Sequence, residues 1–265
     1  MIFAIDMGNT NIVVGCFNDE AILFTERIST DAKKTELEYA VLFKTVLEIH
    51  GITPAMISGS IISSVVPQLV HIMVDAIQKI TPITPVIVGP GVKNGLNIRM
   101  DNPKQLGADL VVDAVAGLQE YGAPLIIIDM GTATTISVID AQKNYVGGMI
   151  LPGVRVSVDS LVSRTSQLPR ISLEAPRKSI GTNTIHCMQS GIVYGQASCL
   201  DGMVDRIEEE LGYKATVVAT GGLAQIITPH CKKEIILDDD LLLKGLKIIY
   251  DKNKNTDLPE GGVLC

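Results

Sequence analysis

The most constraining feature of this sequence is an internal repeat whose two copies lie 123 residues apart. The segment Ile5-Asp6-Met7-Gly8 recurs as Ile128-Asp129-Met130-Gly131. In each copy the Asp and the Gly follow an apolar run, and a hydroxyl-rich turn leads into a second apolar run. Such a spacing is typical of a duplicated structural unit rather than of one short motif that occurs twice.

Apolar runs and turn residues predict the same order of elements around each copy. Each half reads as three strands, a helix, a strand and a helix, and a capping box of Thr35 and Glu38 begins the first helix. The first half has predicted strands at 2–5, 12–17, 21–28, 57–65 and 85–88, helices at about 35–50 and 67–80, a loop at 90–103, and a helix ending near Tyr121. The second half has predicted strands at 125–128, 134–139, 145–150, 215–219 and 234–237, with helices at 154–166, at 185–211, after residue 220 and up to about Tyr250.

Two such βββαβα units predict an α/β protein of two duplicated domains with a cleft between its lobes. We place the first domain at residues 1–118 and the second at 119–250. Residues 251–265 form a polar tail with Asn, Pro and a Gly pair, and we expect this tail to be flexible.

Composition narrows the classes of partner. The chain has 22 Lys and Arg against 29 Asp and Glu, which argues against a main task of neutralising a nucleic-acid backbone. Aromatic residues make up only 4% and Trp is missing, so there is little material for base stacking. A long uncharged stretch, 51–74, is interrupted by serines and prolines, so we expect no membrane span. Five cysteines without a Cys-x-x-Cys pair predict reduced thiols in the cytoplasm.

The two repeated turns are candidate phosphate sites. A single Asp-x-Gly turn is more often a plain hairpin turn, because Gly and Asn tolerate the backbone angles of tight turns. Two such turns at corresponding strand ends can both offer backbone N–H groups and hydroxyls, from Thr10 and Thr132, to phosphate oxygens. The carboxylates of Asp6 and Asp129 would repel a polyphosphate, so they imply cations, with Mg²⁺ expected at Asp6 directly or through water.

Three other segments carry weaker signals. Thr220-Gly221-Gly222 follows an apolar strand, and it is either a plain strand-to-helix turn or a place where a nucleotide's adenosine approaches the backbone. Asp109 lies near the start of the helix that joins the halves. Its carboxylate either interacts favourably with the helix dipole or accepts a proton from a substrate hydroxyl. Asp113, one helical turn later, is the other candidate for the proton acceptor. Asn183 or Thr184 is expected to cap the long helix that follows.

Together these motifs resemble the type III pantothenate kinases. The resemblance covers about residues 1–250 and implies the duplicated ribonuclease H-like fold of the acetate kinase, sugar kinase, Hsp70 and actin superfamily. It implies ATP-dependent phosphorylation of pantothenate, the first step of coenzyme A biosynthesis, by a cytoplasmic homodimer that uses Mg²⁺ and a monovalent cation, K⁺ or NH₄⁺. The motifs that carry it are Asp6 to Asn11, Asn102-Pro103 with Gly107-Ala108-Asp109, Asp129 to Thr134, Gly147-Gly148 with Pro152-Gly153, Asn183-Thr184, and Thr220 to Ala224.

The resemblance also implies roles for individual residues. Asp109 resembles the catalytic base, and Asp129 resembles the ligand of the monovalent cation. Thr132 resembles an ATP contact in the second turn, while Gly221 and Gly222 fit the adenosine. The first phosphate site would comprise Asp6, Met7, Gly8, Asn9, Thr10, Asn11, Ile12 and Val13, and the pantothenate site would comprise Gly107, Ala108, Asp109, Leu110 and Thr184.

Two positions depart from the family pattern. The family usually has Tyr where this chain has Met100, and Arg where this chain has Leu110. An Arg is a natural partner for the pantothenate carboxylate, so Arg99 or Arg164 would have to supply that charge. Two alternatives therefore stay open: a kinase of the same fold for another small hydroxy acid, and a nucleotide-binding regulator without turnover.

Overall fold

The computed structural model describes residues 1–19 and 21–254, and these form two compact units. Among the described residues, the first unit comprises 1–19, 21–95, 102–116 and 240–254, and the second comprises 96–101 and 117–239. The predicted first domain was continuous and ended at residue 118. The first unit observed here also takes in the last helix of the chain, whereas the sequence places this helix within the second domain, 119–250.

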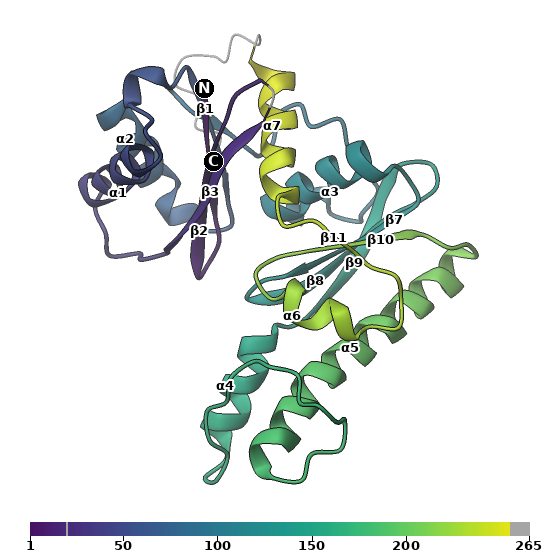
Figure 1. Ribbon diagram of the computed structural model, residues 1–265. Coiled ribbons are helices and arrows are strands. Elements are labelled where there is room, and N and C mark those ends of the chain that lie inside the picture. Colours follow the sequence, from purple (N-terminus) through teal and green to yellow (C-terminus); the bar gives the residue numbers. More distant parts are fainter. Residues whose placement is uncertain (20, 255–265) are drawn as a thin grey trace. The chain divides into compact units, whose positions relative to one another are not determined.

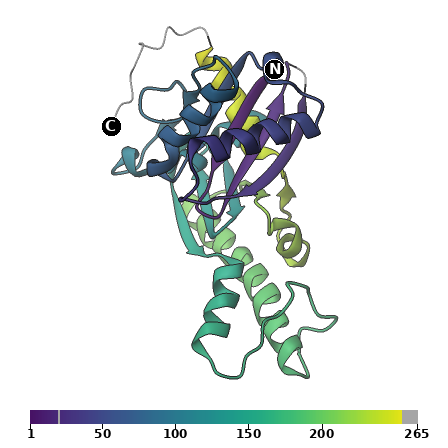
Figure 2. The ribbon, with the colours of Figure 1, turned by 90° about the vertical axis from the view of Figure 1, so that its left-hand side faces the viewer.

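The first unit is built on a five-stranded mixed sheet. Its strand order is β3-β2-β1-β4-β5, in which β1 pairs antiparallel with β2 and parallel with β4. Helices α1 and α2 cover one face of the sheet, and α7 lies against β1 and β4 on the other (Figures 1 and 2). Bounds are β1 (Ile2–Met7), β2 (Asn11–Phe17), β3 (Ile22–Ser29), α1 (Glu36–Ile49), β4 (Gly59–Ser64), α2 (Val70–Ile80), β5 (Val86–Ile87), α3 (Ala108–Tyr121) and α7 (Leu241–Asn253).

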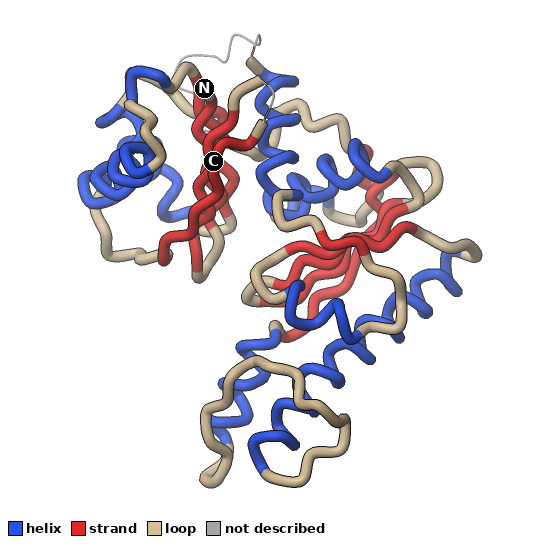
Figure 3. The backbone as a smooth tube through the Cα atoms, viewed as in Figure 1, coloured by secondary structure: helices blue, strands red, loops and turns tan. Residues whose placement is uncertain are grey.

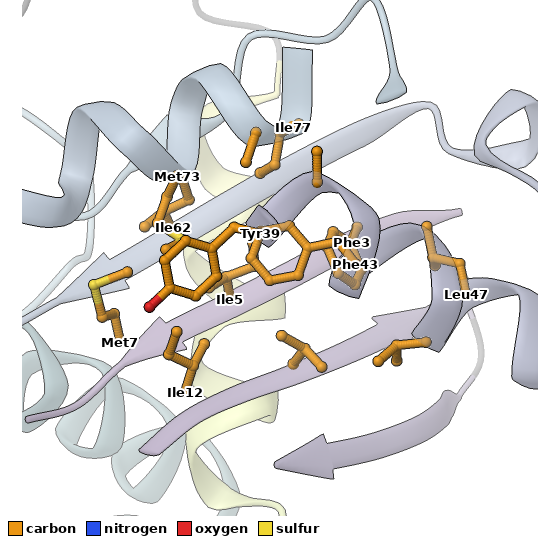
Figure 4. Packing of buried hydrophobic residues seen from close by; sticks show 14 of the residues in the cluster. Phe3, Ile5, Met7, Ile12, Tyr39, Phe43, Leu47, Ile62, Met73 and Ile77 are labelled. Carbon is orange, nitrogen blue, oxygen red and sulfur yellow. The ribbon is translucent and has the colours of Figure 1, made fainter. Parts of the chain in front are cut away.

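Alternation along the central strand separates the core from the site. Phe3, Ile5 and Met7 of β1 and Ile62 of β4 point into the hydrophobic core beneath α1 and α2 (Figure 4). Asp6, between two of these residues, must therefore lie on the opposite face of the sheet. This arrangement places a carboxylate at the carboxyl end of β1. The side chains on either side of Asp6 anchor that strand in the core.

The second unit repeats the same topology. Its six-stranded sheet has the order β11-β10-β7-β8-β9-β6, so that β7, β8 and β9 correspond to β1, β2 and β3. Figure 3 shows the strands of both units in red and the helices in blue. The core lies between this sheet and helices α4 to α6. Bounds are β6 (Asn97–Ile98), β7 (Leu125–Met130), β8 (Ala133–Ile139), β9 (Asn144–Pro152), α4 (Val154–Arg164), α5 (Thr184–Leu211), β10 (Thr216–Thr220), α6 (Ala224–Ile227) and β11 (Ile236–Leu237).

Most predicted elements are confirmed, including the capping box of Thr35 and Glu38 at the start of α1. The loop predicted at 90–103 is wrong in part, because Asn97–Ile98 forms the edge strand β6, which pairs with β9. Asn97–Ile98 lacks the continuous apolar run that predicts the equally short β5 and β11. The last helix continues to Asn253, beyond its predicted end at Tyr250, and the rest of the expected flexible tail, 255–265, lies outside the described residues.

Small residues allow α7 to lie against the sheet and against α3. A Cβ atom at Gly15 would meet the Leu243 side chain at 2.6 Å, and one at Gly59 would meet the Tyr250 ring at 2.5 Å. On the helix itself, a Cβ at Gly245 would overlap the Val112 carbonyl group of α3. Within the described chain, no helix combines the length and the apolar character that a membrane crossing requires.

We predict that Gly245→Ala lowers the free energy of unfolding by about 2 kcal/mol, because the new methyl group would be forced against α3. Gly202 in α5 is a matched control, since an added Cβ meets nothing within 4 Å there. Gly202→Ala should raise the free energy of unfolding by up to about 1 kcal/mol through helix propensity. Urea unfolding of the two variants checks this, and equal effects would contradict the packing described for α7.

Candidate functional site

The first repeated turn is a rigid hairpin loop between β1 and β2. The Gly8 N–H donates to the carbonyl of Asn11 at 3.0 Å. Thr30, just after β3, holds the loop twice: its hydroxyl donates to the Gly8 carbonyl at 2.7 Å, and its N–H donates to the Thr10 carbonyl at 3.0 Å. Asn9, Thr10 and Asn11 are exposed. The loop therefore presents polar groups on a backbone that neighbouring strands hold in place.

The residues that flank this turn differ in what they can offer. The side chains of Met7 and Ile12 are wholly buried in the core, so only their backbone can contact a ligand. Val13 is half-buried. Asp6 is 7% exposed and is aligned in register with Val13 on β2 and Ser63 on β4. The carboxylate thus lies between two paired strands, with a serine beside it.

The second turn is one residue shorter, and two distant glycines pack against it. The Gly131 N–H donates to the Ala133 carbonyl at 3.0 Å, and Thr132 between them is exposed. A Cβ at Gly153, just before α4, would lie 2.8 Å from the Gly131 carbonyl oxygen and would also overlap the Thr132 carbonyl. Only a residue without a side chain allows this approach.

Gly221 approaches the same turn from the end of β10. Its φ of +91° favours glycine, and a Cβ there would lie 2.7 Å from the Met130 nitrogen and overlap the Asp129 carboxylate. The adenosine candidate and the second phosphate turn therefore lie together in this unit, with Gly222 exposed beside them. In the sequence these two segments are connected only by the ligand that both would bind.

Hydroxyl groups flank Asp129 on both neighbouring strands. This half-buried aspartate is in register with Thr135 on β8 and Thr220 on β10. Thr220 is 4% exposed. A carboxylate beside hydroxyl oxygens is the type of donor set that binds hard cations. In the part of the chain that the structure describes, no three His, Cys, Asp or Glu side chains gather into a metal cluster.

Asp109 lies in the first turn of α3, within the first unit. The Leu110 N–H donates to its Oδ1 atom at 2.9 Å, and a Cβ at Gly107 would overlap the carboxylate. Burial raises the pKa of Asp109, although the hydrogen bond from the Leu110 N–H opposes this shift. The rival Asp113 is only 1% exposed, whereas Asp109 is half-buried and more accessible to a substrate.

The predicted substrate residues fall into two groups. Gly107, Ala108 and Leu110 surround Asp109 in the chain and are all half-buried. Thr184 belongs to the other unit, where it is the first residue of α5 after Asn183, whose side chain accepts the N–H of His186 at 2.9 Å. The expected capping of this helix is therefore confirmed for Asn183.

Thr184 also lines a cavity of about 390 Å³ between α4 and α5. The other lining residues are mostly apolar: Leu161, Leu168, Cys187, Met188, Gly191 and Ile192. Arg99 and Arg164, the two candidates for the missing charge, are both exposed. The placement of Thr184 and of either arginine relative to Asp109 stays a prediction.

Several residues at these turns were missed by sequence analysis. Ser63 and Thr135 lie beside the two aspartates only because of strand register, and Thr30 reaches the first turn from just after β3. Thr220 belongs to a motif that the sequence did indicate, but its place beside Asp129 also comes from strand register. Strand pairing between distant segments leaves no local pattern in the sequence. The sequence shows only that a polar residue lies near the end of an apolar strand. It does not show which residue of another strand is aligned with it.

Comparison with known proteins gives a family and a fold. Residues 2–206 match the family model described as type III pantothenate kinase. A type III pantothenate kinase of Bacillus cytotoxicus (strain DSM 22905 / CIP 110041 / 391-98 / NVH 391-98) is 46% identical over 253 residues, which cover 96% of this chain and 97% of that protein.

Solved structures with low sequence identity share the fold. A protein of Campylobacter jejuni, described as a Baf family transcriptional activator, is 20% identical with a TM-score of 0.58, covering 96% of this chain and 99% of that one. Component A of the (R)-2-hydroxyglutaryl-CoA dehydratase of Acidaminococcus fermentans is 14% identical with a TM-score of 0.57, with the same coverage. These likenesses agree with the predicted α/β fold class.

We predict that Asp109→Asn makes the protein more stable at neutral pH. The raised pKa means that the folded state holds the Asp109 proton more tightly than the unfolded chain, whose carboxyl has a pKa of about 3.9. The contribution of protonated Asp109 to the stability of the fold is therefore complete below the pKa of the unfolded chain. It is lost as pH rises through the pKa of Asp109 in the folded protein. The amide avoids that loss and can still accept the Leu110 N–H.

Thermal unfolding of both proteins from about pH 4 to pH 8 measures this effect. The advantage of the Asn variant should grow as pH rises and then level off above the folded pKa. An Asn variant that is less stable than the parent at neutral pH would contradict the assigned burial of the carboxylate.

Proposed function

The chain belongs to the type III pantothenate kinase family, and from this premise we propose that it transfers the γ-phosphoryl group of ATP to the primary hydroxyl of pantothenate, the first step of coenzyme A biosynthesis. The observation that carries this proposal is 46% identity to a type III pantothenate kinase over almost the whole of both chains. The two repeated turns and the half-buried Asp109 supply groups suited to this reaction.

In this proposal, the two turns bind the phosphates of ATP. An acidic chain of net charge −7 must hold a polyanion through backbone N–H groups, hydroxyls and cations rather than through a basic surface. The loop 8–11 and Thr132 offer the first two kinds of group, because both are accessible on backbones fixed by neighbouring strands. Gly221 and Gly222 would accommodate the adenosine next to the second turn.

Asp109 acts as the base that orients the substrate hydroxyl and accepts its proton. Burial raises its pKa above that of an ordinary aspartate, which brings the group closer to the operating pH of a general base. The hydrogen bond from the Leu110 N–H fixes one carboxylate oxygen. Because phosphoryl transfer passes through a loose transition state, positioning the hydroxyl matters more than removing its proton early.

The donor atoms fit the cations that the kinase family implies. Mg²⁺ usually takes one or two carboxylates and completes its shell with phosphates and water, so Asp6 alone suffices without a larger acidic cluster. Asp129, with the hydroxyls of Thr135 and Thr220 beside it, fits a monovalent cation such as K⁺ or NH₄⁺. When bound, these ions would offset the charge of the phosphates.

Three finer points belong to the proposal as well. Arg99 or Arg164 would pair with the pantothenate carboxylate in place of the Arg that Leu110 replaces. The chain would form a homodimer, for which exposed Val156 and Leu161 of α4 and Ile185 of α5 offer an apolar surface. Its cytoplasmic location stays a prediction.

We predict that Asp109→Asn lowers kcat by about 10²- to 10⁴-fold, because the amide cannot accept the hydroxyl proton. ATP binding should be retained, which nucleotide titration of the same variant would check. Near-normal turnover of Asp109→Asn, together with an inactive but folded Asp113→Asn, would transfer the base role to Asp113.

The substrate is tested by product formation from pantothenate and from a panel of small hydroxy acids, with ATP and Mg²⁺. We expect phosphorylated pantothenate as the main product, with faster turnover in K⁺ or NH₄⁺ than in Na⁺. Preference for another acid would favour the alternative kinase suggested by Met100 and Leu110. Tight ATP binding without any phosphorylated product would favour a regulator.

A further inference from the structure

Three buried side-chain hydroxyls in residues 1–19 and 21–254 have no hydrogen-bond partner: Ser63, Thr134 and Thr135. All three lie opposite one of the two Asp-Met pairs of the repeat in strand register. Ser63 is aligned with Asp6, Thr135 with Asp129, and Thr134 with Met130. Buried hydroxyls normally have a partner, because leaving one unpaired destabilises the fold. Ser63 and Thr135 share the face of their sheet with Asp6 and Asp129, whereas Thr134 shares the core face with Met130. The position of Ser63 and Thr135 beside the two aspartates indicates that their partners arrive with a ligand.

Ser63 gives the clearest case, because its surroundings fix which way it points. Ile62, the preceding residue of β4, packs in the core beneath α1 and α2 together with Ile5 and Met7 (Figure 4). Ser63 and Asp6 alternate with these residues, so both lie on the opposite face of the sheet. Since they are register partners on adjacent parallel strands, their side chains stand next to each other. Ser63 is 0% exposed, and Asp6 is 7% exposed.

Ser60 on the same strand shows what a structural serine looks like in this sheet. It is 1% exposed, and its hydroxyl donates to the Phe3 carbonyl at 2.8 Å. That hydroxyl links β4 to β1 in the protein without any ligand. The Ser63 hydroxyl makes no such link, although it is equally buried on the same strand. The two serines therefore form a matched pair for experiments.

We propose that Ser63 is a positioning residue for the Mg²⁺–ATP complex. Its hydroxyl would bond to a water of the hydrated Mg²⁺ held at Asp6, and would thereby fix both the ion and the carboxylate. Mg²⁺ keeps several of its waters in proteins, so a neighbouring hydroxyl has a natural partner there. The inference rests on the proposed function only for the presence of Mg²⁺ and ATP, and it does not depend on the acceptor.

The test compares Ser63→Ala with Ser60→Ala. Without ligand, Ser63→Ala should leave the Tm unchanged or raise it, because no hydrogen bond is lost, whereas Ser60→Ala should lower it. ATP and Mg²⁺ are then titrated, and binding is measured from the rise in Tm. Ser63→Ala should bind about 10-fold more weakly, because one hydrogen bond in a charged site is lost. The Ser60→Ala variant should bind as the parent does.

A double variant shows whether Ser63 acts through the ion at Asp6. In an Asp6→Asn background, which weakens the Mg²⁺ site, adding Ser63→Ala should cause much less than the 10-fold loss expected in the parent. In the kinase reaction, Ser63→Ala should raise the Mg²⁺ concentration that gives half-maximal turnover.

Three outcomes would overturn the inference: a Ser63→Ala variant that loses stability as Ser60→Ala does, one that binds Mg²⁺ and ATP as tightly as the parent, or a full 10-fold effect that persists in the Asp6→Asn background. Failure of the proposed function is distinguishable. A parent that binds Mg²⁺ and ATP but does not phosphorylate pantothenate would refute that function, while the titrations would still decide the role of Ser63.

Discussion

The placement of an aspartate at the carboxyl end of each central strand is the constraint on which the rest of the structure depends. Asp6 and Asp129 are paired on both sides by neighbouring strands, so each carboxylate is fixed by a sheet rather than by a loop. Their strands are anchored by residues such as Ile5 and Ile128, which are wholly buried. In the proposed function, a negative charge held this firmly beside a phosphate would require cations, and the glycine turns would offer backbone groups to the phosphates.

The two halves share a topology but differ in the surroundings of their aspartates. Asp6 is almost buried, between Val13 and a single hydroxyl from Ser63. Asp129 is half-buried and has a threonine on each side. An environment with few oxygen donors suits an ion that keeps its own waters, whereas one with more hydroxyls suits an ion that exchanges water for protein oxygens. The duplication thus provides two similar frameworks, and the flanking strands make them chemically distinct.

Local patterns in the sequence were sufficient to predict the repeat, nearly all strands and helices, and the residues of both turns. They could not predict which side chains strand pairing would bring together. Ser63 lies 57 residues after Asp6, and nothing near either residue indicates that the two are aligned. The same applies to Gly153 and Gly221, whose need for glycine arises from contact with the second turn rather than from their own segments. β6 was missed because Asn97–Ile98 lacks the continuous apolar run that predicts the equally short edge strands β5 and β11.

The helix α7 gives the chain an unusual order of completion during synthesis. Residues 117–239 supply almost all of the second unit in one continuous stretch, so this unit can form as soon as that stretch has left the ribosome. The first unit begins the chain, yet the helix that lies against its central strands β1 and β4, residues 241–253, is made last. The unit that is begun first is therefore completed last, and a chain that ends before α7 lacks the helix that lies against the strand carrying Asp6.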